Sequence, residues 1–139
     1  MFVELNLAEI LESMEIKYTF EILNKTQIKE LCEKIKKIIQ EYKIKNVKSE
    51  YQRAINNAVN HGSYPITGSI YIGKKNQIVC IITDSGKGFD YKQMIKKYQS
   101  GEIYYKLHGF GTKCLASNKH LQIDWHDEGR TIILYYNGK

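Results

Sequence analysis

Three short groups of residues in this 139-residue chain have types and spacings that suit ligand binding. The first places Asn57 and His61 four residues apart, the second is the run DSGKGF at residues 84–89, and the third is the run HGFGT at residues 108–112. Carboxylate and amide groups supply hydrogen bonds, and glycines let the backbone turn sharply and approach a ligand closely. Together the three groups predict one binding site assembled from separate segments.

Asn57 falls in a predicted helix over residues 47–61. Glu50, Arg53, Asn57 and either Asn60 or His61 recur there at spacings of three and four, so they share one helix face and can meet a common ligand. Polar residues on one side of an amphipathic helix are more often simply solvated. This face therefore indicates a site only in combination with the other two groups.

Asp84 follows residues 78–83, a near-continuous apolar run of the length typical of a central strand covered on both faces. A carboxylate at a strand end can accept a hydrogen bond from the exocyclic amine of a base. Gly86 and Gly88 would let the backbone approach that base. A plain strand-to-helix turn is the competing interpretation of this run.

Residues 109–112 open a further predicted helix, over residues 111–118. Free N–H groups at a helix N-terminus, with the helix dipole behind them, favour anions such as phosphate. Gly109 and Gly111 would permit close approach of the phosphate. A lone GxG is common, but the three groups in this order point jointly to a nucleotide.

The elements that position these groups follow from hydrophobic periodicity. Between residues 26 and 42 apolar side chains recur every three or four residues, which is typical of an amphipathic helix. Predicted strands cover residues 17–23, 66–73, 78–83, 120–126 and 130–136, with a turn at 74–77, a left-handed Gly62 and a helix cap at Asp90. This order predicts an α+β fold: a two-layer α/β sandwich whose mixed, mostly antiparallel sheet carries its helices on one face.

Composition narrows the class of protein. The chain length fits one domain, and residues 1–5 do not resemble a secretory signal, so we expect a cytoplasmic protein with no membrane segment. Cys32, Cys80 and Cys114 lack metal-ligand spacing and lie in apolar stretches, which predicts structural thiols. The net charge of +6 is spread over many lysines, which indicates a solvated surface and no direct contact with nucleic acid; an acidic protein partner stays open.

The three motifs resemble the nucleotide site of the Bergerat-fold (GHKL, histidine-kinase-like) ATPases, which include gyrase, sensor histidine kinases and the bacterial anti-sigma-factor serine/threonine kinases. The last group is the most similar in size and motif wording. The resemblance covers about residues 17–136, so it implies an ATPase domain over residues 17–139 and an N-terminal extension over residues 1–16. A histidine-kinase fragment is disfavoured, because no dimerisation helix with a phosphoacceptor histidine precedes the domain.

Carried over residue by residue, the resemblance implies ATP or ADP with Mg²⁺ as cofactor. Asn57 matches the asparagine that holds Mg²⁺ against the phosphates, and Asp84 matches the aspartate that reads adenine. The remaining candidate nucleotide-binding residues are His61, Gly86, Gly88, Gly109, Phe110, Gly111 and Thr112. Residues 90–108 correspond to the lid over ATP, in which Lys92, Lys96, Lys97 and Lys106 are candidate phosphate contacts.

Arg53 departs from the family pattern, which has a general-base glutamate at this position. A guanidinium stays protonated and cannot act as that base. Three interpretations stay open: Glu50, about one further turn along the helix, replaces the base; Arg53 stabilises charge at the γ-phosphate; or nucleotide acts only as a conformational ligand or is not bound at all.

The resulting hypothesis is an ATP- or ADP-binding regulatory protein similar to the anti-sigma-factor kinases, acting in transcription regulation, in which phosphoryl transfer to a protein is an open question. The resemblance implies a sigma factor or an anti-sigma antagonist as partner, and a second copy of the chain. The alternative from another class is a nucleotide-independent protein-interaction module built on the same fold.

Overall fold

The computed structural model describes residues 1–101 and 117–138. Within them the chain forms four α-helices and five strands, and all five strands belong to one sheet. In chain order these are α1 (Leu7–Leu11), β1 (Glu15–Ile22), α2 (Ile28–Glu41), α3 (Glu50–His61), β2 (Ile66–Ile72), β3 (Ile78–Thr83), α4 (Tyr91–Gln99), β4 (Leu121–His126) and β5 (Thr131–Tyr136). The α+β class predicted from the sequence is confirmed.

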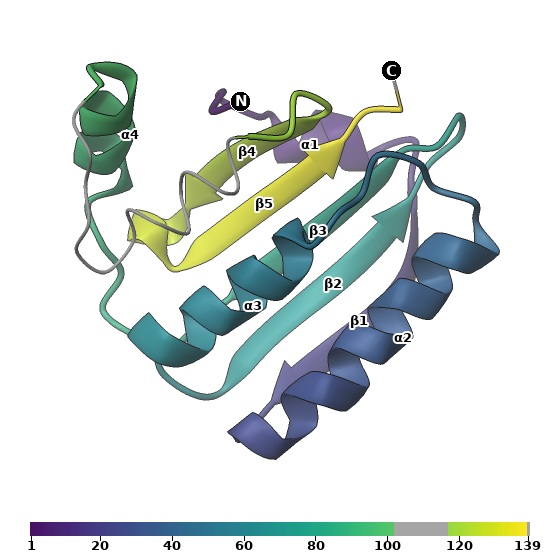
Figure 1. Ribbon diagram of the computed structural model, residues 1–139, viewed down its shortest axis with the longest axis horizontal. Helices are drawn as coiled ribbons and strands as arrows, with labels where there is room; N and C mark the ends of the chain where they lie inside the picture. Colours follow the sequence, from purple (N-terminus) through teal and green to yellow (C-terminus); the bar gives the residue numbers. More distant parts are fainter. Residues whose placement is uncertain (102–116, 139) are drawn as a thin grey trace.

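The sheet has the strand order β1-β2-β3-β5-β4, and every neighbouring pair is antiparallel. The prediction of a mixed sheet is therefore wrong for these five strands, because each is joined to its neighbour by an antiparallel ladder. Within the described residues the only isolated parallel pairing is a single bridge between Phe2 and Ile123, outside the named strands. Figure 1 shows the sheet with α2 and α3 lying across one face.

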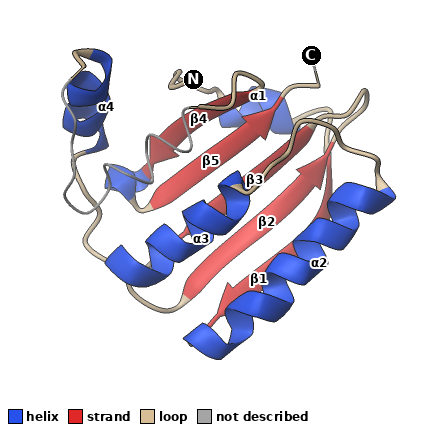
Figure 2. Cartoon of the chain, viewed as in Figure 1, coloured by secondary structure: helices blue, strands red, loops and turns tan. Residues whose placement is uncertain are grey.

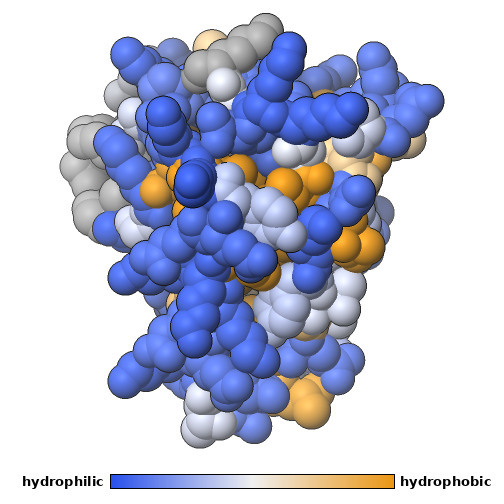
Figure 3. Space-filling view, turned by 90° about the vertical axis from the view of Figure 1, so that its right-hand side faces the viewer, coloured by the Kyte–Doolittle hydropathy of each residue, from blue (hydrophilic) through white to orange (hydrophobic). Residues whose placement is uncertain are grey.

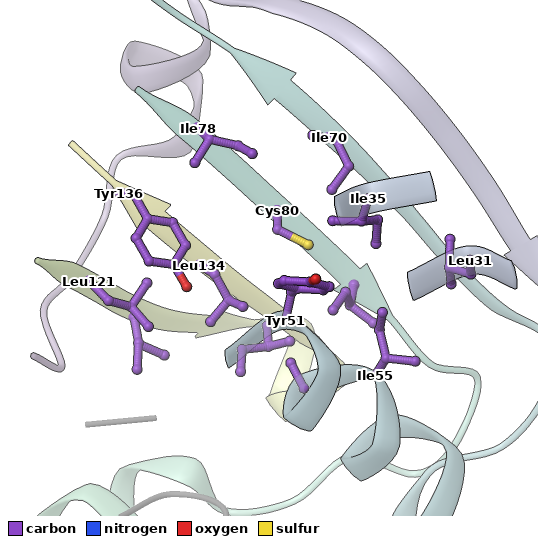
Figure 4. Packing of buried hydrophobic residues seen from close by; sticks show 14 of the residues in the cluster. Leu31, Ile35, Tyr51, Ile55, Ile70, Ile78, Cys80, Leu121, Leu134 and Tyr136 are labelled. Carbon is purple, nitrogen blue, oxygen red and sulfur yellow. The ribbon is translucent and has the colours of Figure 1, made fainter. Parts of the chain in front are cut away.

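Alternation along the strands explains this arrangement. Register places Tyr18, Ile70, Cys80, Leu134 and Ile123 in one row across all five strands. Because side chains two residues apart point to the same face, the apolar residues of each strand gather under the helices. Figure 4 shows this layer, with Cys80 at its centre between strands and helices. Each fully buried isoleucine of the layer contributes roughly 1.5–3 kcal/mol.

The helices bury the stripes that the sequence predicts. On α2 the innermost residues are Leu31 and Ile35, and on α3 they are Tyr51, Ala54 and Ile55. α2 follows a short 3₁₀ turn, Lys25–Gln27, that carries a capping box: the Asn24 side chain accepts from backbone N–H and Gln27 reaches back to the cap. Asp90 caps α4 as expected, accepting a 3.1 Å hydrogen bond from the Gln93 N–H.

Two local predictions are corrected. Gly62 closes α3 in an extended conformation (φ −99°, ψ −155°) where a left-handed one was expected, because the chain leaves the helix directly toward β2. Not all helices lie on one face: α1 lies behind the sheet, opposite α2 and α3, as Figure 2 also shows. The helix predicted over residues 111–118 lies almost wholly outside the described residues.

The N-terminal extension is part of the fold. Residues 1–5, which we call the N-terminal arm, run along the outer edge of β4: Val3 N–H donates to Ile123 O at 3.1 Å, and Ile123 N–H donates to Met1 O at 2.8 Å. The chain then forms α1 and enters β1 at the opposite edge of the sheet. The arm therefore covers an edge that would otherwise expose unpaired backbone groups.

A buried carboxylate joins the start of α3 to the end of the sheet. Glu50 is 5% exposed, and its Oε1 accepts hydrogen bonds from the Tyr136 hydroxyl, from Lys48 N–H at 3.0 Å and from Asn118 Nδ2 at 3.3 Å. Burial and the neighbouring carboxylate raise the pKa of Tyr136, which keeps its hydroxyl protonated and donating. A buried charge needs such partners, so this network fixes α3 against β5.

The surface over α2 is strongly hydrophilic (Figure 3). Lysines and acids alternate along its outer side, where Lys29, Glu30, Glu33, Lys34, Lys36 and Lys37 are all exposed. This matches the solvated lysine-rich surface predicted from the charge distribution. In the described part of the chain, no helix is both long enough and apolar enough to cross a membrane.

Tyr136→Phe tests the Glu50 network. Removing the hydroxyl leaves a buried carboxylate with one donor fewer, so we expect the free energy of unfolding to fall by about 1–3 kcal/mol in urea denaturation. The matched control is Tyr135→Phe on the opposite face. Its hydroxyl accepts a long 3.3 Å hydrogen bond from Gln77 Nε2 at a half-buried position, where water can replace it, so the loss should be less than about 0.5 kcal/mol. Equal losses in the two variants would contradict the role given to Glu50.

Candidate functional site

A cleft opens where α3, the end of β3 and the start of β5 meet. In the described structure it is narrow: the space that a water-sized sphere can enter is about 60 Å³, below the roughly 300–1,000 Å³ that is usual for a small-molecule site. Three of the sequence-predicted residues from the first two groups, Asn57, His61 and Asp84, line it together with Gly88. The other lining residues are Ala54, Ala58, Gly62, Ile82, Phe89, Met94, Trp125, Gly129, Arg130 and Ile132.

The cleft is apolar inside and polar at one end. Ile82, Met94 and Ile132 are buried residues of its lining, contributed by β3, α4 and β5. Small side chains at Ala54 and Ala58 leave room beside α3. An apolar pocket with a few convergent polar groups is the usual form of a small-molecule or cofactor site.

Asp84 is the polar group best placed to orient a ligand. It follows the last residue of β3, and its Oδ1 accepts a 2.8 Å hydrogen bond from Gly86 N–H. Partial burial raises the pKa of the Asp84 carboxyl; the Gly86 N–H and the nearby Arg130 guanidinium partly offset that rise. A carboxylate has about four acceptor positions, so acceptor capacity is left for a ligand.

Glycines allow the segments around Asp84 to pack closely. A Cβ on Gly62 would lie 2.5 Å from Asp84 Cγ, and one on Gly86 would lie 3.0 Å from Asp84 Oδ1. Gly88 has φ +79°, and a Cβ there would lie 2.1 Å from Glu128 O. Only glycine fits that last position, because both the backbone conformation and the contact exclude a side chain.

The helix residues separate into two groups. Asn57 is half-buried and faces the cleft, and the exposed His61 lines its rim. Arg53, one turn earlier on α3, is exposed and is not among the described residues that line the cleft. Glu50, considered as a substitute base, lies in the buried network with Tyr136 and outside that lining, so its carboxylate serves the core.

Arg130 belongs to the site but gave no signal in the sequence. It precedes β5, and its backbone oxygen accepts a 2.9 Å hydrogen bond from Asp84 N–H, which extends the β3–β5 ladder by one residue pair. Its guanidinium lies 3.4 Å from the Asp127 carboxylate and 3.3 Å from the Glu128 carboxylate. Only the pairing of β3 with β5, which are separated by 47 residues of chain between Thr83 and Thr131, brings this cation beside Asp84.

An aromatic cluster forms the wall of the cleft next to α4. Trp125 of β4 contacts Phe89 edge-on, stacks on Tyr91 with ring centroids 5.9 Å apart, and meets Phe2 of the N-terminal arm at 5.6 Å. Phe2 also contacts Tyr98 of α4 at 5.5 Å. The alternation of β4 predicts that Trp125 faces inward, but its partners come from two distant segments, the N-terminal arm and residues 89–91.

The third sequence group lies outside the described residues. Gly109, Phe110, Gly111 and Thr112, with His108, Lys106 and Cys114, fall in the range 102–116. Lys92 and Lys96 are exposed on α4, and Lys97 is half-buried there. None of these three lines the cleft in the described structure.

The cysteines that the structure describes behave as structural thiols. Cys32 and Cys80 are free, and burial raises the pKa of Cys80 to about 12, so it stays protonated. Among the described residues, no group of three or more histidine, cysteine, aspartate or glutamate side chains could hold a metal ion. A cation in the cleft would therefore need oxygens from a ligand in addition to the Asn57 amide.

Comparison of the chain with protein-family models, with curated proteins and with solved structures finds no match in any of the three. The resemblance of the motifs to Bergerat-fold ATPases therefore stays a prediction. What the site can bind follows from its own residues.

Asp84→Asn tests the electrostatic cost of the site. Because the pKa of Asp84 is higher in the folded state than in the unfolded state, ionisation of Asp84 destabilises the fold. This destabilisation is absent below the ordinary aspartate pKa and reaches its full value above the folded-state pKa. We expect the variant to be at least as stable as the wild type at pH 7, with an advantage in unfolding free energy that disappears on acidification through that window. Denaturant titrations from pH 3 to pH 8 measure this, and an advantage independent of pH would contradict it.

Proposed function

We propose that this protein binds an adenine nucleotide, ATP or ADP with Mg²⁺, in the cleft and uses it as a regulatory ligand. The observation that carries the proposal is the convergence of Asp84 and Asn57 on one apolar cleft from two separate elements. Each residue alone has an ordinary explanation. The folding of α3 and of the β3 end does not by itself require these two side chains to share a pocket. Gly88, which packs against the turn 127–129, lines the same pocket.

The base would occupy the apolar part of the cleft. Ile82, Met94 and Ile132 offer the flat apolar surface that a purine needs, and Asp84 offers an acceptor for its exocyclic amine. Gly86 N–H holds the carboxylate in place, so little side-chain entropy is lost when the base binds. These features fit a nucleobase that presents an amino group.

The phosphates and Mg²⁺ would lie toward Asn57. Mg²⁺ usually takes one or two protein oxygens and completes its shell with phosphate oxygens and water, and an amide oxygen is a suitable ligand. Bound there, Mg²⁺ would neutralise the charge of the phosphates. The motif resemblance also assigns residues 109–112, which lie outside the described residues, to the phosphates.

Phosphoryl transfer is not part of the proposal. Arg53 stands where the resemblance requires a general base, and its guanidinium cannot accept a proton. Glu50 cannot replace it while three donors hold its Oε1 in the core.

A protein that binds nucleotide without turning it over can still be regulated by the ratio of ATP to ADP, if its affinity for a protein partner differs between the two states. A sigma factor or its antagonist is the kind of partner that the motif resemblance suggests.

Calorimetry with Mg-ATP, Mg-ADP and Mg-GTP tests the binding. We expect the wild type to bind adenine nucleotides, and Asp84→Asn to lose about 10-fold or more in affinity, because the asparagine oxygen stays with Gly86 N–H and its NH₂ group then faces the amino group of the base. Asn57→Ala should weaken binding in the presence of Mg²⁺ more than in its absence.

Asp90→Asn is the matched control for these variants. It makes the same chemical change at an N-cap that does not line the cleft in the described structure, and asparagine caps a helix as well as aspartate does. Its affinity should equal that of the wild type. No binding by a folded wild type would refute the nucleotide proposal and leave the nucleotide-independent interaction module as the alternative.

Labelled ATP tests the claim about catalysis. We expect no transfer or hydrolysis by the wild type above the uncatalysed rate, because Arg53 stands at the position of the family's general base and Glu50 is held in the core. Arg53→Glu should bind nucleotide and is the variant in which turnover could appear. Appreciable turnover by the wild type would overturn this part of the proposal.

A further inference from the structure

The N-terminal arm and the cleft share one side chain. Trp125 lines the cleft and also lines a second groove, larger than the cleft at about 600 Å³, whose walls include Phe2, Val3 and Leu5 of the arm. Trp125 is 5% exposed, so the arm and the aromatic residues around it cover the ring almost completely. A change at the arm must therefore change the surroundings of a cleft residue.

A short set of hydrogen bonds holds the arm on β4. The Met1 ammonium donates to Leu121 O at 2.7 Å, Ile123 N–H donates to Met1 O at 2.8 Å, and Val3 N–H donates to Ile123 O at 3.1 Å. One further bond goes to a side chain. Asp124, 8% exposed, accepts the Leu5 N–H at 2.9 Å through Oδ2 and the Trp125 N–H at 2.8 Å through Oδ1, and His126 Nε2 lies 3.1 Å from Oδ2. Val3 and Leu5 are only half-buried. A segment attached by a short ladder and one carboxylate belongs to the low-stability end of a fold and can open locally.

The arm also contacts the helix that closes the cleft. Phe2 packs against Tyr98 near the end of α4, while Met94 on the same helix is a buried residue of the cleft lining. Tyr91 at the start of α4 stacks on Trp125. With the arm in place, Trp125 and α4 are held together from outside; with the arm lifted, both lose an aromatic contact.

We propose that the N-terminal arm is a strap coupled to the nucleotide cleft: docking of residues 1–5 on β4 and binding of nucleotide stabilise the same arrangement of Trp125 and α4. This inference rests on the proposed function, because it names how that site is regulated. A ligand that packs on Trp125, Phe89 and Met94 would hold Trp125 in the position that Phe2 contacts. Conversely, a docked Phe2 would hold Trp125 in the position that the ligand contacts. Such coupling is reciprocal by thermodynamic linkage.

Hydrogen exchange in the wild type is the first measurement. The Val3 and Leu5 amides are hydrogen-bonded only while the arm is docked, so saturating Mg-ADP should slow their exchange roughly 3- to 10-fold, the factor expected from one or two aromatic contacts. Trp125 is the only tryptophan of the chain, so its fluorescence should change on binding in parallel. Unchanged exchange at saturation, with binding shown by calorimetry, overturns the strap and leaves the proposed function intact. Absence of binding overturns both.

Two variants act on the arm without touching the cleft polar groups. Phe2→Ala should weaken Mg-ADP binding roughly 3- to 10-fold, and Phe2→Leu should restore part of the loss. Asp124→Asn should weaken it through a different contact, because the asparagine oxygen can stay with Trp125 N–H while its NH₂ group opposes Leu5 N–H. All affinities are measured well below the unfolding temperature of each variant, so a loss of global stability does not enter.

Tyr18→Ala is the matched control for Phe2→Ala. Tyr18 pairs with Phe20 at a ring-centroid distance of 6.0 Å on β1, at the opposite edge of the sheet. Its loss should lower stability without changing affinity for Mg-ADP or exchange at Val3 and Leu5. Wild-type affinity in both Phe2→Ala and Asp124→Asn would overturn the strap.

Discussion

The antiparallel pairing of β3 with β5 is the constraint on which the rest of the site depends. The ladder runs from Ile78–Tyr136 to Thr83–Thr131 and is continued by the hydrogen bond from Asp84 N–H to Arg130 O. Beyond it the two turns interlock: Phe89 N–H donates to Glu128 O, while Gly88 and Gly129 each leave no room for a Cβ against the facing backbone. A shift in register would separate Asp84 from Arg130 and open the glycine loop, because alternation in a strand makes every one-residue slip reverse the faces.

Two carboxylates on or near this frame show how surroundings decide the role of a residue. Glu50 is buried and Asp84 is half-buried. Glu50 is surrounded by donors from the protein, and these hydrogen bonds hold α3 to β5. Asp84 has part of its acceptor capacity left and faces an open cleft, and its pKa is raised by burial. An ionised Asp84 therefore lowers the free energy of unfolding, but its unused acceptor positions are available to a ligand. This trade-off between stability and function is common at binding sites.

Periodicity was sufficient for most of the fold. The alternation at residues 66–73 and 130–136, the apolar run at 78–83 and the helical stripes of α2 and α3 each placed their elements close to the observed bounds, since one buried face dictates a period of two or 3.6. What failed were features without a period. Gly62 could serve either a left-handed cap or an extended exit, and the position of β2 decided for the second. Residues 1–5 carry no strong pattern, and only the free edge of β4 shows why they dock there.

The sequence by itself determined an α+β chain with Asn57 on a helix, Asp84 at a strand end and glycines after it, because residue type and local spacing fix secondary structure and the chemistry available at each position. Only the tertiary structure decided which of these groups meet. In it, Asn57 and Asp84 line one cleft together with Arg130 and Trp125. Glu50 lies in the core, and Phe2 packs against Trp125 of the cleft wall. The physical reason is that contacts across a sheet depend on strand order and register, and residues that are 27 to 123 positions apart carry no local signal of their pairing.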